Sequence, residues 1–142
     1  MDDALRQLVW DRAGDACEYC HLPQRFDVLP FQIDHVIPVK HHGPTVAANL
    51  ALACLNCNRH KSSDLAGIDE VTGALTRLFH PRQDSWDEHF AWQGAVLIGR
   101  TTVGRVTIDV LKINLAERVQ HRRLLWEAGL FPPRRRSPGE PA

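Results

Sequence analysis

Four cysteines form two Cys-x-x-Cys pairs, and they account for every cysteine in the chain. The pairs are Cys17 with Cys20 and Cys54 with Cys57. A tetrahedral Zn²⁺ takes four thiolates, and each Cys-x-x-Cys turn presents two of them to one side of the ion. The interval between the pairs is longer than in a compact zinc ribbon. We therefore predict one structural zinc that holds together the two ends of the segment between the cysteine pairs.

Two other fates of the cysteines fit the sequence less well. A secreted disulfide framework requires an apolar signal segment, whereas the chain opens with the acidic stretch Met1–Ala4. A thioredoxin-like redox pair uses one such motif in a βαβ setting, and here there are two. No apolar run approaches the length that crosses a bilayer. The sequence therefore predicts a soluble, cytoplasmic metal-binding protein with no membrane partner.

The segment between the cysteine pairs, with the residues directly after the second pair, carries a second set of side chains that could act in catalysis or metal binding. Asp34 and His35 lie in a strand-like segment, Asn49 follows a loop, and Asn58 and Lys61 come directly after the second pair. This order resembles the HNH nuclease family: a strand ending in Asp-His, a loop to an Asn, and a Cys-x-x-Cys followed by Asn or His with Lys three residues on. The resemblance covers about residues 13–63, and it is specific because several independent elements must coincide.

The resemblance implies a metal-dependent DNA endonuclease in which each of these residues has a role. His35 would accept a proton from the attacking water, so cleavage should climb between about pH 5.5 and 7.5. Asp34 and Asn58 would hold the catalytic Mg²⁺ or Mn²⁺ through hard oxygen donors. Asn49 would brace the loop or orient the base, since an amide donates and accepts without titrating. Lys61, on the helical face of Asn58, would contact phosphate.

The sequence departs from the family pattern mildly. Members often have histidine at the position of Asn58, and the amide favours Mg²⁺ or Mn²⁺ over a softer ion. His60 is an alternative ligand, although two residues along a helix it would face away from Asn58. Arg59 and Lys40 are less certain phosphate contacts. The main competing hypothesis is a non-catalytic zinc module that binds nucleic acid or protein, and a third is a nuclease directed at RNA.

Several elements must position these residues. The sequence predicts a first helix capped by Asp2 or Asp3 and stopped at Gly14. Residues 31–37 alternate with β-period and end at Pro38, so Asp34 and His35 should face opposite ways and share a site only at the strand terminus. A second strand is expected at residues 50–53, and a short helix at residues 58–66 with its start fixed by Cys57. The predicted class is α+β, with a ββα-metal (His-Me finger) core and zinc knuckles.

The rest of the chain predicts an α/β extension. Residues 1–67 would form the HNH core with its N-terminal helix, residues 68–133 a packed C-terminal extension, and residues 134–142 a basic, proline-rich tail. Turn signals at residues 69–73 and an apolar run at 95–99 indicate strands, and two helices follow, the second ending at Gly129. Trp86, Phe90 and Trp92 are expected to pack together in the interior rather than to stack on bases.

Charge alone does not indicate nucleic-acid binding. The net formal charge is zero, with 44% hydrophobic and 24% charged residues, an ordinary globular composition that disfavours a histone-like mode of binding. Residues 115–142 hold six Arg residues against three Glu. This basic surplus, which includes Arg118, Arg122 and Arg123, is equally consistent with a solvated surface and with a phosphate-binding arm.

Overall fold

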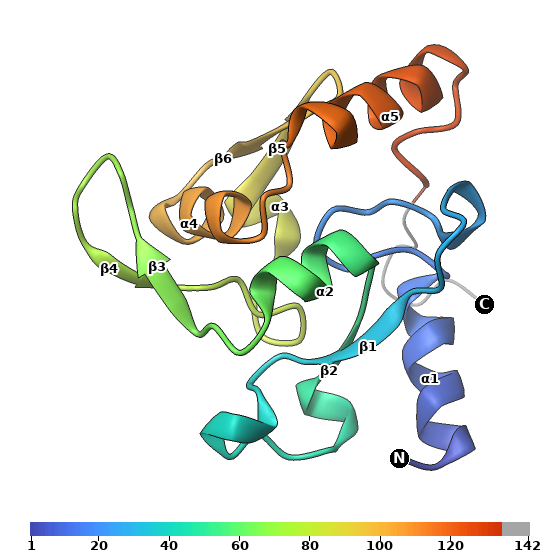
Figure 1. The fold of residues 1–142 in the computed structure, drawn as a ribbon, viewed down its shortest axis with the longest axis vertical. Coiled ribbons are helices and arrows are strands. Elements are labelled where there is room, and N and C mark those ends of the chain that lie inside the picture. Colours follow the sequence, from blue (N-terminus) through green and yellow to red (C-terminus); the bar gives the residue numbers. More distant parts are fainter. Residues whose placement is uncertain (135–142) are drawn as a thin grey trace.

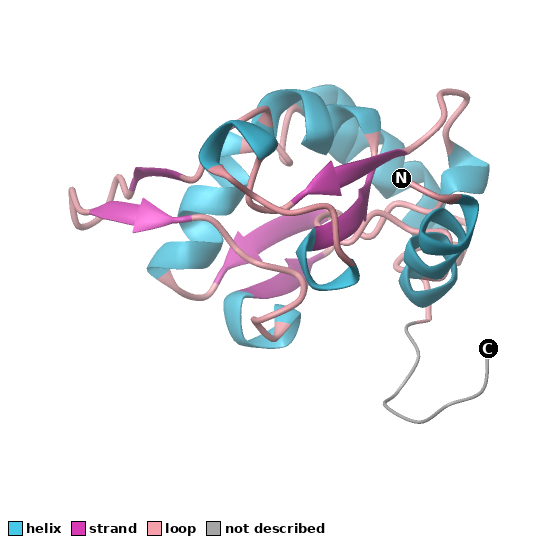
Figure 2. Cartoon of the chain, turned by 90° about the horizontal axis from the view of Figure 1, so that it is seen from below, coloured by secondary structure: helices cyan, strands magenta, loops and turns pink. Residues whose placement is uncertain are grey.

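The computed structural model describes residues 1–134, so the predicted tail lies outside the described residues except for Arg134. The fold mixes helices with three separate two-stranded antiparallel sheets. The helices pack around the short strands, and the β3–β4 hairpin projects at one side (Figure 1, Figure 2). Within the described part of the chain, no helix combines the length and the apolar character required to cross a membrane.

The first helix forms as the sequence predicts. Helix α1 spans Asp3–Ala13, and the Asp2 side chain accepts a hydrogen bond from the Leu5 backbone N–H at its start. Gly14 ends the helix in the left-handed conformation, with φ of 62°, which glycine adopts without a steric penalty. This end delivers the chain directly into the first cysteine pair.

A β-hairpin follows and holds the Asp-His pair. Strand β1 (Gln32–His35) pairs antiparallel with β2 (Leu50–Ala53), with Asp34 opposite Ala51. The predicted strand, residues 31–37, was longer than the observed one. Asp34 and Val36 are buried, whereas Ile37 is exposed. A carboxylate can occupy the buried face only because it finds polar partners there.

Helix α2 (Leu55–Lys61) begins earlier than predicted and ends sooner. Its start is at Leu55 because the Cys54 sulfur acts as the N-cap and accepts a hydrogen bond from the Cys57 backbone N–H. Its end is set by Ser62, which adopts a positive φ of 49°. The helix therefore contains the second cysteine pair, and Figure 1 shows it between the β1–β2 hairpin and the rest of the chain.

The extension contains the predicted strands and helices in order, together with a short helix and a strand at residues 86–93 that were not predicted. Its elements are β3 (Ala66–Ile68), β4 (Leu75–Arg77), α3 (Trp86–His89), β5 (Phe90–Gln93), β6 (Val96–Gly99), α4 (Thr102–Val110) and α5 (Ala116–Glu127). Single 3₁₀ turns at Gln24–Phe26, Val39–His41 and Ala47–Asn49 complete the first part. Strand β3 crosses the domain boundary expected at residue 67.

One continuous apolar core joins the two parts of the molecule. The predicted aromatic cluster is confirmed: the Trp86 ring lies 5.2 Å from Phe90 and 6.0 Å from Trp92, centroid to centroid. The Trp86 indole N–H donates to the Tyr19 carbonyl at 3.0 Å, so the cluster is anchored to the first cysteine pair. The buried cysteines belong to the same core. The extension therefore packs against the cysteine pairs and supports them through the shared core.

Candidate metal centre and active site

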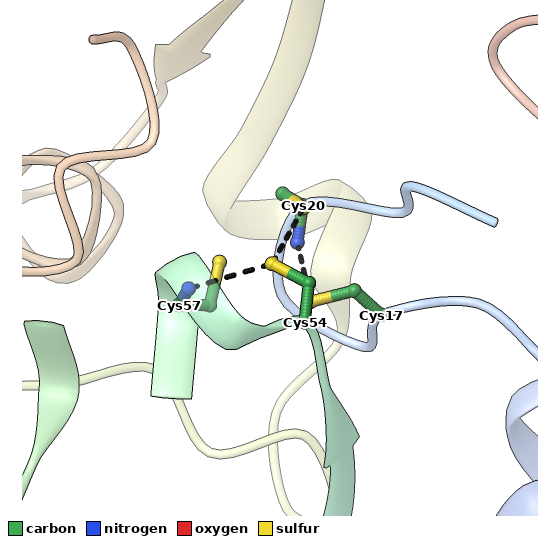
Figure 3. A group of neighbouring side chains, drawn as sticks. All are labelled: Cys17, Cys20, Cys54 and Cys57. Carbon is green, nitrogen blue, oxygen red and sulfur yellow. Dashed lines mark hydrogen bonds between the residues drawn. The ribbon is translucent and has the colours of Figure 1, made fainter. Parts of the chain in front are cut away.

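The four cysteines converge in the interior. Their sulfur atoms all lie within 4.8 Å of one another, and Cys20 Sγ is 3.8 Å from Cys54 Sγ. Cys17 and Cys20 come from the loop after α1, and Cys54 and Cys57 from the start of α2 (Figure 3). Tetrahedral coordination with Zn–S bonds of ~2.3 Å places sulfurs roughly 3.8 Å apart. The donor set therefore fits a structural metal such as zinc.

The electrostatics of the cluster also favour a bound cation. Burial raises the pKa of the Cys17 thiol well above its ordinary value, and hydrogen bonds with the other thiols, chiefly Cys17, raise that of Cys57. The same hydrogen bonds lower the pKa of Cys20 well below its ordinary value. The buried thiols therefore cannot all ionise together unless a cation compensates their charge.

Helix α5 supplies positive charge next to the sulfurs, which sequence reasoning missed. The Arg118 guanidinium lies 3.6 Å from Cys54 Sγ. Arg122 is 2% exposed and donates to the carbonyl oxygens of Ala95 and Ile113, each at 2.9 Å. Burial tends to lower the pKa of Arg118, but the nearby Cys54 thiolate and its neighbours raise it overall. Part of the basic surplus, for which we expected either a solvated surface or a phosphate-binding arm, is thus interior charge beside the cysteines.

Asp34 sits at the centre of a buried polar network. It is 5% exposed, and its Oδ2 accepts a hydrogen bond from the Tyr19 hydroxyl at 2.7 Å. The Lys61 ammonium lies 3.2 Å from Oδ1 and 3.1 Å from Oδ2. Burial raises the pKa of the Asp34 carboxyl, and Lys61 and Tyr19 oppose that rise. The predicted metal ligand is therefore a well-ordered carboxylate that already has a cationic partner.

The position of Lys61 corrects one expectation. We predicted a phosphate contact on the helix surface, but Lys61 is 1% exposed. Its ammonium also donates to the His35 carbonyl at 3.1 Å. Helical spacing from Asn58 gives a direction but not a depth, and the depth of Lys61 depended on a buried carboxylate that the pattern did not reveal. Lys61 joins α2 to β1 instead of pointing to solvent.

His35 is the last residue of β1. It therefore lies at the strand terminus, where we expected Asp34 and His35 to be able to share a site. Its side chain is half-buried and turns away from Asp34, towards the loop that follows. The Nε2 atom lies 2.8 Å from Thr45 Oγ1. Thr45 carried no signal in the sequence beyond its place in a turn-rich loop. The hydroxyl can fix the ring orientation while the imidazole remains accessible.

Asn49 braces the loop between the two strands. Its Oδ1 accepts from the Ile37 backbone N–H at 2.9 Å, and its Nδ2 donates to the carbonyl oxygens of Ile37 and Pro44 at 3.0 and 2.9 Å. Gly43 passes so close that a Cβ there would lie 1.7 Å from the Ile37 oxygen. Within the described residues, the side chain of Asn49 thus holds the loop and does not bond to His35.

Asn58 lies half-buried on α2, one helical turn before Lys61. Because residues three apart share a helical face, its amide belongs to the side of α2 that Lys61 turns towards Asp34. Within residues 1–134 its side chain makes no hydrogen bond. His60 instead bonds the Asn56 carbonyl of its own helix through Nδ1, at 2.9 Å. His60 is thereby tied to its own helix through one ring nitrogen, and Asn58 stays the predicted ligand.

A comparison with protein families finds a match within the first part of the chain. The family model described as HNH endonuclease matches residues 17–64, a range that contains both cysteine pairs and every candidate site residue. No curated protein and no solved structure matches the chain. The resemblance read from the sequence is confirmed for this segment.

Proposed function

Because residues 17–64 match the HNH endonuclease family, we propose that the protein is a metal-dependent DNA endonuclease with a ββα-metal core. The strands are β1 and β2, and the helix is α2. The observation that carries the proposal is the placement of a buried carboxylate and an accessible imidazole on successive residues at the end of β1. Asp34 faces Lys61 of α2, while His35 faces Thr45 in the loop.

His35 is the proposed general base. A neutral imidazole can take the proton of an attacking water near neutral pH. Thr45 Oγ1, at 2.8 Å from Nε2, holds the ring in one orientation, which leaves the other ring nitrogen for the water. Asn49 keeps the loop that carries Thr45 in place through its three backbone hydrogen bonds. These contacts pre-organise the base without substrate.

Asp34 and Asn58 are the proposed ligands of the catalytic ion. Their oxygens are hard donors that suit Mg²⁺ or Mn²⁺. Such an ion, when bound, would neutralise charge on the scissile phosphate and the leaving oxygen. Lys61 meets both carboxylate oxygens in the structure, so its ammonium must shift for Asp34 to bind a cation. We propose zinc for the four cysteines, where it would stabilise the fold.

A plasmid-nicking assay with added Mg²⁺ or Mn²⁺ tests the function. His35→Ala should fold, retain its cysteine-bound metal and bind DNA, yet cleave about 100-fold or more slowly, since a general base contributes 10²–10⁴-fold. His121→Ala, on α5 and remote from β1, is the matched control and should cut like the wild type. Cleavage by the wild type should rise between about pH 5.5 and 7.5.

Two results would contradict this assignment. Unchanged cleavage by His35→Ala would indicate another base or a contaminating nuclease, and a flat pH profile would argue against an imidazole. Supplying DNA and RNA side by side decides which polymer is the substrate.

A second candidate is a non-catalytic, zinc-stabilised module that binds nucleic acid. The observation in its favour is that both oxygens of Asp34 are already engaged by Lys61 and Tyr19. Under this alternative the purified protein would bind DNA but cut neither polymer with any divalent ion, and Asp34→Asn would leave binding unchanged.

A further inference from the structure

Tyr19 lies between two cysteines and reaches the candidate active site. It is 1% exposed and occupies the third position of the first Cys-x-x-Cys turn. Its ring meets Phe79 edge-on, with centroids 6.5 Å apart, and its carbonyl accepts the Trp86 indole N–H. The ring is thus fixed by the aromatic core on one side and by the cysteine turn on the other.

The Tyr19 hydroxyl points to one acceptor, the Asp34 carboxylate. The 2.7 Å distance from the hydroxyl to Oδ2 is shorter than either distance from the Lys61 ammonium. A phenol held in a rigid wall is a directional donor, whereas a lysine ammonium sits on a flexible stem. When Lys61 gives way to a divalent cation, the tyrosine is the contact that remains to hold the carboxylate.

We propose that Tyr19 is a positioning residue for the catalytic ion, acting through Asp34. The first cysteine pair would then do more than tie the fold: it would set the orientation of a ligand in a different metal site. This inference rests on the proposed function, because it takes Asp34 as a ligand of the divalent cation. Partners of a metal ligand commonly change metal affinity when they are removed.

Tyr19→Phe tests the idea, since it removes the hydroxyl and keeps the ring. The affinity for Mn²⁺, measured by electron paramagnetic resonance without DNA, should fall about 10- to 100-fold. Asp34→Asn should abolish this Mn²⁺ binding, which would show that the measured signal comes from the ion at Asp34. Thr76→Val is the matched control, because Thr76 has a buried hydroxyl bonded to the Ala74 carbonyl in the distant β3–β4 hairpin, and its Mn²⁺ affinity should equal that of the wild type.

A second readout separates positioning from support of the fold. Co²⁺ placed at the four cysteines gives sulfur-to-metal absorption bands that report the geometry of the cysteine pairs. In Tyr19→Phe these bands should match the wild type while Mn²⁺ affinity falls.

Unchanged Mn²⁺ affinity would overturn the proposal, as would joint loss of the cobalt bands and Mn²⁺ binding, which would assign Tyr19 to folding. If Mn²⁺ affinity falls as expected but the wild type cuts neither DNA nor RNA, the nuclease function fails and the role of Tyr19 stands.

Discussion

At the scale of single residues, the pair formed by Asp34 and Lys61 dominates the energetics of the candidate site. Both side chains are nearly inaccessible, with 6% and 1% exposed, so each charge has lost most of its hydration. A buried pair of this kind contributes little net stability, but removal of one partner is costly because the other charge is left uncompensated. The pair thus makes the folded state sensitive to whichever cation faces Asp34.

Lys61→Met should therefore destabilise the protein in the absence of divalent cations. We expect a loss of about 3–5 kcal/mol in the free energy of unfolding, measured by chemical denaturation of the protein with its cysteine-bound metal. Added Mn²⁺ should recover part of that loss and should raise the melting temperature more than in the wild type, because no ammonium competes for Asp34.

Lys40→Met is the control for this experiment, since Lys40 is an exposed lysine on the neighbouring loop and should change neither quantity. A Lys61→Met variant as stable as the wild type, or indifferent to Mn²⁺, would show that the ammonium and the ion do not share Asp34.

Residue types and spacing predicted the sulfur cluster better than they predicted the contacts of the other candidate residues. The two Cys-x-x-Cys pairs led to the sulfur cluster because a metal centre needs a fixed set of ligands. The burial of Lys61 escaped prediction because helical spacing gives direction but not depth. Tyr19 and Thr45 had no signal of their own, since a single hydroxyl has many ordinary uses.

At the scale of elements, an ion pair connects the projecting hairpin to α4. Asp69, just after β3, accepts two hydrogen bonds from the Arg105 guanidinium at 3.0 and 3.1 Å, and Thr72 donates to it as well. These bonds, chiefly those from Arg105, hold the pKa of the Asp69 carboxyl far below its ordinary value. The hairpin is thereby fixed to the second part of the molecule.

This ion pair predicts an acid-dependent loss of stability. A carboxyl with a depressed pKa in the folded state stabilises that state above its unfolded pKa of about 3.9, and the stabilisation is lost as the pH falls below that value. Asp69→Asn should therefore lower stability at pH 6 and flatten its dependence on pH below about 4. Urea denaturation of both proteins from about pH 2.5 to about pH 6 measures the effect, because this range extends at least about one unit to either side of the unfolded pKa of about 3.9.

Glu88→Gln, at an exposed carboxyl on α3, serves as the comparison for Asp69→Asn. Parallel pH curves for wild type and Asp69→Asn would exclude the Asp69–Arg105 pair as the cause.

Most elements were predictable because their ends are encoded locally. Asp2 and Gly14 bound α1 through a side-chain cap and a left-handed residue, two signals visible in the sequence. The start of α2 was misplaced because a cysteine sulfur, an unusual N-cap, begins the helix. The burial of Asp34 in β1 was not predicted, because alternation of apolar residues takes no account of a carboxylate with internal partners.

At the scale of the whole molecule, the sulfur cluster joins segments that are far apart in the chain. The loop after α1, the start of α2 and the cationic side of α5 all meet there, with Arg118 of α5 at 3.6 Å from Cys54 Sγ. Structural metal binding is linked to folding free energy, since the ligands are assembled only in the folded state. The C-terminal extension should therefore depend on an ion held by the first part.

Removal of that ion tests this dependence. Chelation of the wild type, or Cys57→Ser, should abolish hydrogen-exchange protection in α2 and also in α5, near Arg118. Readdition of Zn²⁺ should restore protection in the chelated wild type but not in Cys57→Ser. Protection that persists in α5 while α2 opens would show that the extension folds independently of the cluster, and Mg²⁺ added in place of Zn²⁺ should restore nothing.

The lysine at the carboxylate has a consequence for how such a protein behaves between encounters with its target. A site that carries its own counter-charge does not have to retain a divalent ion in order to stay folded, so the ion can come and go with its concentration in solution. The ion at the four cysteines would then stay bound, whereas the ion at Asp34 would exchange with the solution. A nuclease built in this way would rest inactive by default.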